Sequence, residues 1–178
     1  MKRLLKYAAY AALALIAATL LASAIGLLLP RRHTAASSLV IHRPAEDVWL
    51  AITDIASQPQ WRTDLNSAER LADHDGRQVW LQRTDMGDWT LELTRMEPTR
   101  VLVATVADST QGFGGTWTYE LDEDDERTVL RITERGFIDQ PLFRFLARFV
   151  FGLHGSQETY LEDLSHHLGQ KAQPKREI

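Results

Sequence analysis

The stretch SLVIHRPAEDVWLAITDI, residues 38–55, decides the fold class of this chain. Its apolar and β-branched beginning predicts a strand, which must end near Pro44 because proline has no backbone N–H to donate. After the proline, apolar residues recur at helical spacing: Val48, Trp49, Ile52 and Ile55. The stretch therefore predicts a strand followed directly by a short helix.

The residues after this helix predict an antiparallel meander and one long closing helix. Pro59 and Trp61 mark a second short helix or turn. Turn signals such as Asp75-Gly76 and Glu97-Pro98 then separate six strands, which we place at 66–73, 78–84, 89–96, 101–108, 116–121 and 128–135. From Asp139 to Gly169, apolar residues follow a 3.6-residue period, which predicts a helix about 45 Å long.

This order of elements predicts an α+β helix-grip fold. A curved antiparallel sheet of about seven strands would wrap around the long C-terminal helix, with two short helices after the first strand. A curved sheet and a straight helix do not fit flush, so we expect a hollow between them.

The N-terminal segment predicts a single transmembrane helix. Residues 7–29 carry no charge, and as a helix they would cover about 35 Å, against a hydrocarbon core of about 30 Å. Basic residues Lys2, Arg3 and Lys6 favour an inside N-terminus, and therefore a domain on the outer, non-cytoplasmic side. A cleaved signal peptide is the alternative, because Ala22-Ser23-Ala24 has the small residues of a cleavage site. The apolar run is longer than the signal-peptide pattern requires.

The chain thus divides into five predicted segments, in which the tether and tail are too polar to bury a core. They are a basic flank (1–6), the transmembrane helix (7–29), a tether (30–38), the folded domain (39–170) and a charged tail (171–178).

Composition excludes several kinds of site. The chain has no cysteine, which excludes disulfides, thiolate zinc sites and iron–sulfur clusters. The histidines have no ligand spacing such as H-E-x-x-H, so we expect neither a metal nor another cofactor. Acidic residues outnumber basic ones, 24 to 20, and three of the basic ones precede residue 7. Such an acidic body is a poor nucleic-acid partner.

Five short motifs, in order, resemble the START-like or SRPBCC superfamily, which includes polyketide cyclase/dehydrase-like proteins. They are Ile41–Trp49, Pro59-Gln60-Trp61, Glu97-Pro98, Thr128–Gly136 and Tyr160–Leu164, and the resemblance covers about residues 39–169. It implies a cavity for an apolar or amphipathic ligand such as a lipid, sterol, polyketide or quinone. The superfamily shares no catalytic set, so the resemblance implies no catalytic residue.

Alternation along the strands assigns side chains to the inward face. The candidate cavity residues are Trp61, Leu81, Arg83, Trp89, Leu91, Leu93, Arg95, Trp117, Tyr119, Leu130, Ile132, Glu134, Phe149 and Leu153. Arg83, Arg95 and Glu134 could form a polar end of the pocket; the alternative is an ion pair at the rim of the sheet. The aromatic residues could equally be ordinary core.

We expect a membrane-tethered module that binds or transfers a small hydrophobic ligand, rather than an enzyme. One alternative is a cyclase/dehydrase-like enzyme that acts on a hydrophobic carbonyl compound through Glu134, Arg95 or Tyr119. Another is a membrane-associated interaction or regulatory protein with a collapsed cavity. Four phenylalanines fall within 143–151, more than one core stripe needs, so some either contact the short helices or touch the bilayer.

Overall fold

The computed structural model describes residues 2–106, 112–124 and 126–177. In chain order its elements are α1 (Lys2–Leu28), β1 (Arg32–Ile41), α2 (Ala45–Thr53), η1 (Gln58–Gln60), β2 (Ser67–Arg70), β3 (Val79–Thr84), β4 (Gly87–Glu97), β5 (Val101–Val106), β6 (Phe113–Asp124), β7 (Arg127–Ile138), α3 (Pro141–Leu146), η2 (Ala147–Phe151), α4 (Gly155–His167) and β8 (Lys175–Glu177).

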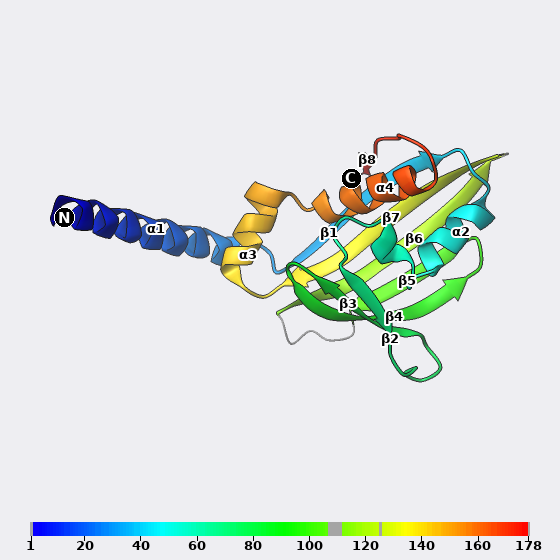
Figure 1. The fold of residues 1–178 in the computed structure, drawn as a ribbon, viewed down its shortest axis with the longest axis horizontal. Coiled ribbons are helices and arrows are strands. Elements are labelled where there is room, and N and C mark those ends of the chain that lie inside the picture. Colours follow the sequence, from blue (N-terminus) through cyan, green and yellow to red (C-terminus); the bar gives the residue numbers. More distant parts are fainter. Residues whose placement is uncertain (1, 107–111, 125, 178) are drawn as a thin grey trace.

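Within the described residues, eight strands form one antiparallel sheet in the order β2-β3-β4-β5-β6-β7-β1-β8. Strands β2 to β7 are the predicted meander; residues 107 and 108 of the strand predicted over 101–108 lie outside the described residues. Strand β1 closes onto β7 in an uninterrupted register from Arg32 opposite Phe137 to Ile41 opposite Thr128. The sheet curves around α2 and α4, which cover its concave face (Figure 1). The predicted α+β helix-grip fold is confirmed.

The core lies between this concave face and α4. Leu39 and Ile41 of β1 and Leu130 and Ile132 of β7 are almost fully buried. They pack with Tyr160, Leu161 and Leu164 of α4 in one cluster. Burial of each such side chain contributes about 1.5–3 kcal/mol, so these contacts hold the helix against the sheet.

Both predicted unstructured ends contain strands. The tether predicted over 30–38 is wrong from Arg32 onward, because β7 offers a long ladder that pairs with β1 as far as its first residue. Its alternate residues Ala35 and Ser37 are buried. Part of the tail predicted over 171–178 forms β8, which pairs with β1 opposite residues 36–38.

The closing helix is split into three pieces, and the prediction of a single helix is wrong. The α3 helix ends at Leu146, a π-helical turn η2 follows, and α4 starts only at Gly155. Gly152 between them has φ +79°, a conformation that no right-handed helix can contain. The residues between 139 and 154 are therefore free to follow a path away from the sheet.

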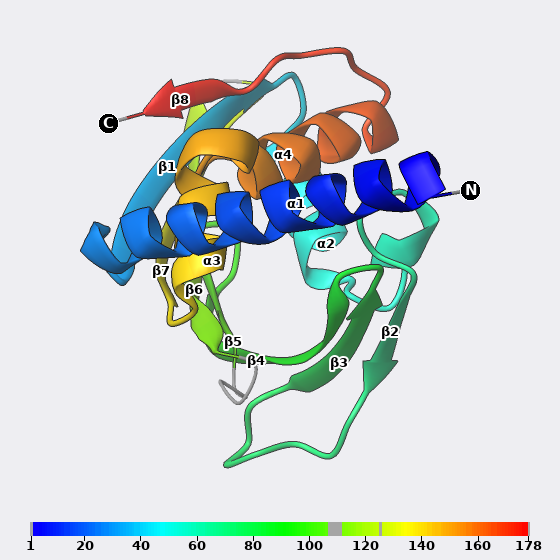
Figure 2. The ribbon, with the colours of Figure 1, turned by 90° about the vertical axis from the view of Figure 1, so that its left-hand side faces the viewer.

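The α1 helix extends from the domain at the end where α3 lies (Figures 1 and 2). By length and composition, its segment Arg3–Leu28 could cross a membrane, and few of its side chains are buried. The backbone of α3 lies so close to α1 that a Cβ on Gly26 would be 1.9 Å from the carbonyl oxygen of Pro141.

Candidate functional site

Strand register decides which side chains face the helices, because directly paired residues share one face of a sheet. From β4 across to β7, the concave face carries these residues: Leu91, Leu93, Leu102, Ala104, Trp117, Tyr119, Leu121, Leu130, Ile132 and Glu134. Trp89 lies on the same face because it is two residues before Leu91 on the same strand. For most of the candidate residues the predicted inward direction therefore agrees with the register.

Leu81 and Arg83 lie on the opposite, convex face, so their predicted direction is wrong. Gln82 pairs with Trp89 across the β3–β4 hairpin, and this puts Gln82, not its neighbours, on the concave face. The side chain of Arg83 is 43% exposed, and its guanidinium forms an ion pair with Glu69 at 3.0 Å. It cannot provide a polar end to an interior pocket.

Arg95 is also on the convex face, and a β-bulge is the reason. The pairing of β4 with β5 shifts between Leu93 and Arg95, which reverses the alternation beyond this point. Arg95 bonds Glu97 at 2.7 Å, and its side chain is 57% exposed. The alternative of a rim ion pair describes this residue better than the pocket hypothesis does.

Aromatic rings fill the half of the concave face that lies under α4. The ring of Tyr160 has its centroid 5.5 Å from that of Trp61, 6.0 Å from Trp117 and 5.7 Å from Tyr119. Burial raises the pKa of both tyrosines above the ordinary value, so their hydroxyls stay neutral. This half is packed core rather than hollow.

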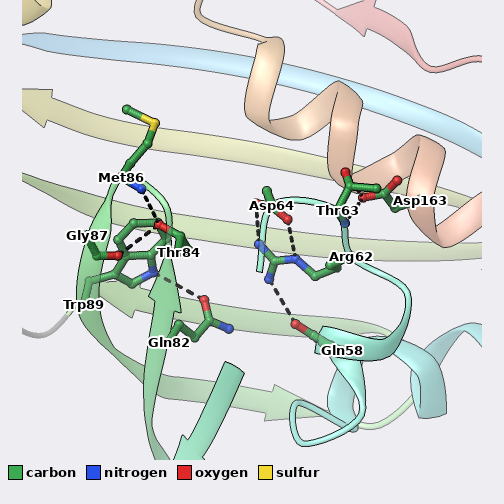
Figure 3. A network of polar contacts seen from close by, with 10 residues as sticks. All are labelled: Gln58, Arg62, Thr63, Asp64, Gln82, Thr84, Met86, Gly87, Trp89 and Asp163. Atoms are coloured by element: carbon green, nitrogen blue, oxygen red, sulfur yellow. Dashed lines mark hydrogen bonds and ion pairs between the residues drawn. The ribbon is translucent and has the colours of Figure 1, made fainter. Parts of the chain in front are cut away.

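A buried guanidinium borders that aromatic cluster. Arg62 donates two hydrogen bonds to Asp64, at 3.0 and 2.8 Å, and one to Gln58 at 3.0 Å (Figure 3). It also lies over the Tyr160 ring, 5.1 Å from its centroid. Burial by itself would lower the pKa of Arg62, but the hydrogen bonds and charge of Asp64 outweigh burial and raise it. Arg62 therefore stays charged, with Asp64 as its counterion.

The other half of the concave face, towards α3, is apolar and only partly covered. Trp89, Leu91, Phe113 and Trp117 are all half-buried, and Trp117 stands at the border between the two halves because it also contacts Tyr160. The rings of Trp89 on β4 and Phe113 on β6 meet edge to face, with centroids 6.0 Å apart, although β5 lies between their strands. These four side chains form what we call the α3-side surface. Phe113 was not predicted, because its glycine-rich surroundings indicate a turn.

Two buried polar groups face inward from the same sheet. Gln82 is 2% exposed and its Oε1 accepts a hydrogen bond from Trp89 Nε1 at 3.3 Å (Figure 3). Glu134 Oε1 lies 3.1 Å from His33 Nε2. Within the described part of the chain, Gln82 Nε2 and Glu134 Oε2 are buried without a hydrogen-bond partner. A buried donor and a buried acceptor are thus left unpaired on this face.

His33 can reach Glu134 because the residue opposite it is a glycine. Gly136 pairs with His33 across β1 and β7, and a Cβ there would lie 2.7 Å from His33 Cε1. Alternation along β1 through Leu39, Ser37 and Ala35 could have identified His33 as inward-facing. The prediction of a tether over these residues left this alternation unused.

The remaining two candidates lie outside the concave face. Phe149 is 60% exposed on η2, so its predicted place in the cavity is wrong; the split of the closing helix turns it outward. Leu153 is half-buried in the turn that precedes α4.

Two of the hollows that the described residues form are open to the surface. The larger, about 510 Å³, lies between α2 and the end of α4 and is lined by Arg43, Asp47, Leu50, Ala51, Asp54, Ser57, Trp61, His167, Leu168 and Gly169. The smaller, about 360 Å³, is a groove between α1 and α3, lined by Ala18, Thr19, Leu21, Ala22, Ile25, Leu142, Phe145 and Leu146. Neither of these two hollows is lined by a residue of the α3-side surface.

Comparison with known proteins identifies the family. The model of the family described as polyketide cyclase/dehydrase and lipid transport matches residues 32–168. The chain belongs to this family. The match begins with β1 and ends just after α4. Membership supports a module that binds a hydrophobic ligand or acts as a cyclase.

Solved structures of low sequence identity share the fold. The Zhui aromatase/cyclase from Streptomyces sp. R1128 is 16% identical, with a TM-score of 0.63 over 78% of this chain and 94% of that one. A START superfamily protein from Mycobacterium smegmatis is 13% identical, with a TM-score of 0.59 over 76% and 99%. Norcoclaurine synthase from Thalictrum flavum is 9% identical, with a TM-score of 0.60 over 77% and 86%. Among curated protein sequences, none matches the chain.

Proposed function

We propose that this protein is a membrane-tethered module that binds or transfers a small hydrophobic ligand carrying a polar group. Its site is the α3-side surface together with Gln82 and Glu134. The observation that carries the proposal is the pairing of half-buried aromatic and aliphatic side chains with a buried, unpartnered amide N–H on one face. Apolar walls with a few placed polar groups are the usual composition of small-molecule sites.

The geometry supports an aromatic or polycyclic ligand. Trp89, Phe113 and Trp117 offer ring faces and edges for contact with a flat molecule. The Gln82 N–H can donate to a carbonyl or hydroxyl oxygen of such a ligand, which would relieve the cost of leaving this group unpaired. A lipid, polyketide, quinone or sterol that carries one such oxygen fits these requirements.

Tryptophan fluorescence of the full chain in lipid nanodiscs tests this function. Naphthoquinone should quench the indoles of the α3-side surface with a saturable dependence on concentration. Naphthalene, which has the same ring system without carbonyl oxygens, should bind more weakly.

A matched pair of variants separates binding from partition into lipid. Leu91→Arg puts a charge on the α3-side surface and should abolish saturable quenching. Leu81→Arg puts the same charge on the convex face of the neighbouring strand and should leave quenching unchanged. Equal quenching of both variants and the wild type would reject this surface as the site.

The contact between His33 and Glu134 supports a second candidate function, acid–base catalysis on a hydrophobic carbonyl compound. Neutral His33 can donate its Nε2 proton to Glu134 Oε1, which orients the carboxylate and leaves Oε2 as a base. Oε2 would take a proton from the carbon next to a carbonyl, and the bonding electrons would form the enolate. While the carboxyl group holds this proton, it can exchange it for one from solvent water, and return of the solvent proton to the carbon restores the carbonyl compound with one proton exchanged.

Exchange of the protons adjacent to the carbonyl of tetralone, followed by NMR in heavy water, tests this second function. The wild type should accelerate exchange, and Glu134→Gln should return it to the uncatalysed rate because an amide cannot act as the base. Equal rates for the wild type and the variant would exclude Glu134 as the base and leave the binding function standing.

A further inference from the structure

The segment formed by α3 and η2 exposes a cluster of large apolar side chains. Phe143 is 46% exposed, Phe149 60%, Val150 60% and Phe151 63%. The ring of Phe149 also lies against that of Phe145 of α3, with centroids 5.1 Å apart and ring planes tilted by 48°, so the apolar contact continues from η2 to α3. Soluble proteins rarely expose so many adjacent large apolar side chains without a partner for them.

Contacts with Gly26 of α1 and with Leu29 and Arg31 just after it hold this segment in place. The carbonyl oxygen of Pro141 occupies the place where a Cβ of Gly26 would be. Arg144 Nη1 donates to the carbonyl oxygen of Leu29 at 2.9 Å. Arg31 donates from Nε to Asp139 Oδ1 at 3.0 Å. The depth of α3 relative to a bilayer is therefore set by α1.

The groove between the two helices indicates what that depth is. Its walls are three apolar side chains of α3 and five side chains of α1, those of Ala18, Thr19, Leu21, Ala22 and Ile25, of which Thr19 alone has a hydroxyl. That hydroxyl donates to the carbonyl oxygen of Leu15 at 2.9 Å and needs no water. Ala18 is ten residues before Leu28, or about 15 Å further along α1. If α1 spans a bilayer, α3 lies beside a part of it that is in contact with acyl chains.

The charges of the segment are compatible with this placement. Arg144 bonds two backbone carbonyl groups, those of Leu29 and Asp139, so its guanidinium does not require water for these donors. Arg148 is exposed on η2, and its long side chain can reach the headgroups.

We infer that α3 and η2 are embedded in the interfacial layer of the membrane, with Phe149, Val150 and Phe151 among the lipid acyl chains. The partner of this apolar cluster is the bilayer itself, rather than a second protein. The inference rests on the membrane tether of the proposed function and extends it. It places the α3-side surface of the sheet next to the lipid, so that a ligand could pass between them without crossing water.

Single cysteine labels can test this placement, because the chain has no cysteine of its own. Val150→Cys, Leu15→Cys and Glu126→Cys would each carry nitrobenzoxadiazole in the full chain, reconstituted in vesicles of phosphatidylcholine and phosphatidylglycerol. Leu15 tests whether α1 is in the membrane, and Glu126 in the β6–β7 turn is the control at the far end of the sheet. Lipids with a nitroxide on the acyl chain quench labels in the bilayer, and iodide quenches labels in water.

We expect the Val150 and Leu15 labels to be quenched several-fold more by the nitroxide lipid than the Glu126 label, and to be protected from iodide. Because Val150 is exposed, its label should not disturb folding; Phe151→Cys provides a second label in the same cluster. A lipid-quenched Leu15 label with an iodide-accessible Val150 label would overturn the inference alone. A Leu15 label outside the lipid would overturn the tether as well. A Val150 label protected from both quenchers would mean a protein partner, which also overturns the inference.

Discussion

Replacement of Gln82 by methionine tests two effects of this side chain separately: its cost to the stability of the fold and its contribution to ligand affinity. Gln82 Nε2 is buried without a partner in the described part of the chain, and such a donor costs about 1–3 kcal/mol. The variant also loses the 3.3 Å bond from Trp89 Nε1, worth about 0.5–1.5 kcal/mol. Because methionine has a similar volume, we expect Gln82→Met to be as stable as the wild type or more stable, by up to about 2 kcal/mol.

Binding should change in the opposite direction. If Gln82 donates to the ligand, its loss removes one hydrogen bond of about 0.5–1.5 kcal/mol, or about a 2- to 10-fold weaker affinity. Urea unfolding of the full chain in detergent gives the first quantity, and quenching by naphthoquinone gives the second. Affinity for naphthalene should not change, because naphthalene cannot accept this bond.

Gln78→Met is the matched control. Gln78 Oε1 accepts a hydrogen bond from Trp80 Nε1 at the same 3.3 Å, but Gln78 has no buried donor without a partner. This variant should lose stability slightly and bind naphthoquinone normally. If Gln82→Met were destabilised by several kcal/mol and still bound naphthoquinone normally, Gln82 would be a structural group and our reasoning about the site would be refuted.

Three further perturbations test other parts of the structure. Gly136→Ala should displace the His33 ring, and NMR should register this as a changed His33 signal, since the new Cβ would lie 2.7 Å from His33 Cε1. Gly115→Ala should lower the free energy of unfolding by about 1–3 kcal/mol, since this residue has φ +148° and its Cβ would meet a backbone carbonyl of β7; unchanged urea unfolding would contradict this. The hydrogen bond from Arg176 lowers the pKa of Glu158, so their contact should stabilise β8 above about pH 4.3 and weaken as pH falls through the lowered value. Lower protection of the β8 amides from hydrogen exchange on acidification, relative to their intrinsic exchange rates and absent in Arg176→Gln, is the expected readout.

Sequence patterns predicted the sheet well, because the meander is built from local signals. The turn at Glu97-Pro98 and the alternation through Trp117 and Tyr119 both agree with the structure. In a long antiparallel strand without a bulge, every second residue lies on the same face. The pattern therefore assigned Leu130, Ile132 and Glu134 to the correct face.

The predicted inward and outward directions were wrong at two places, the β3–β4 hairpin and the bulge between β4 and β5. Thr84 pairs with Gly87, so even-numbered residues of β3 oppose odd-numbered ones of β4, and Leu81 cannot share a face with Leu91. Val79 and Trp80 are both buried, so the hydrophobic pattern of β3 does not distinguish its two faces. The bulge beyond Leu93 leaves no comparable signal in the sequence.

The prediction of a single closing helix was wrong for a different reason. A 3.6-residue period continues through residues 142–168, but Gly152 adopts a conformation that periodicity does not detect. The contacts of Gly26 and Leu29 with the α3 region then determine the path of η2. Contacts between segments more than 100 residues apart are not encoded in local pattern.

The most direct test of the account is native mass spectrometry of the full chain, released from nanodiscs prepared from the cell membranes that contain it. We predict that the wild type and Leu81→Arg carry the same additional small hydrophobic mass and that Leu91→Arg does not. Bound mass of equal abundance in all three proteins, or none in the wild type, would contradict the claim that the α3-side surface holds a guest molecule.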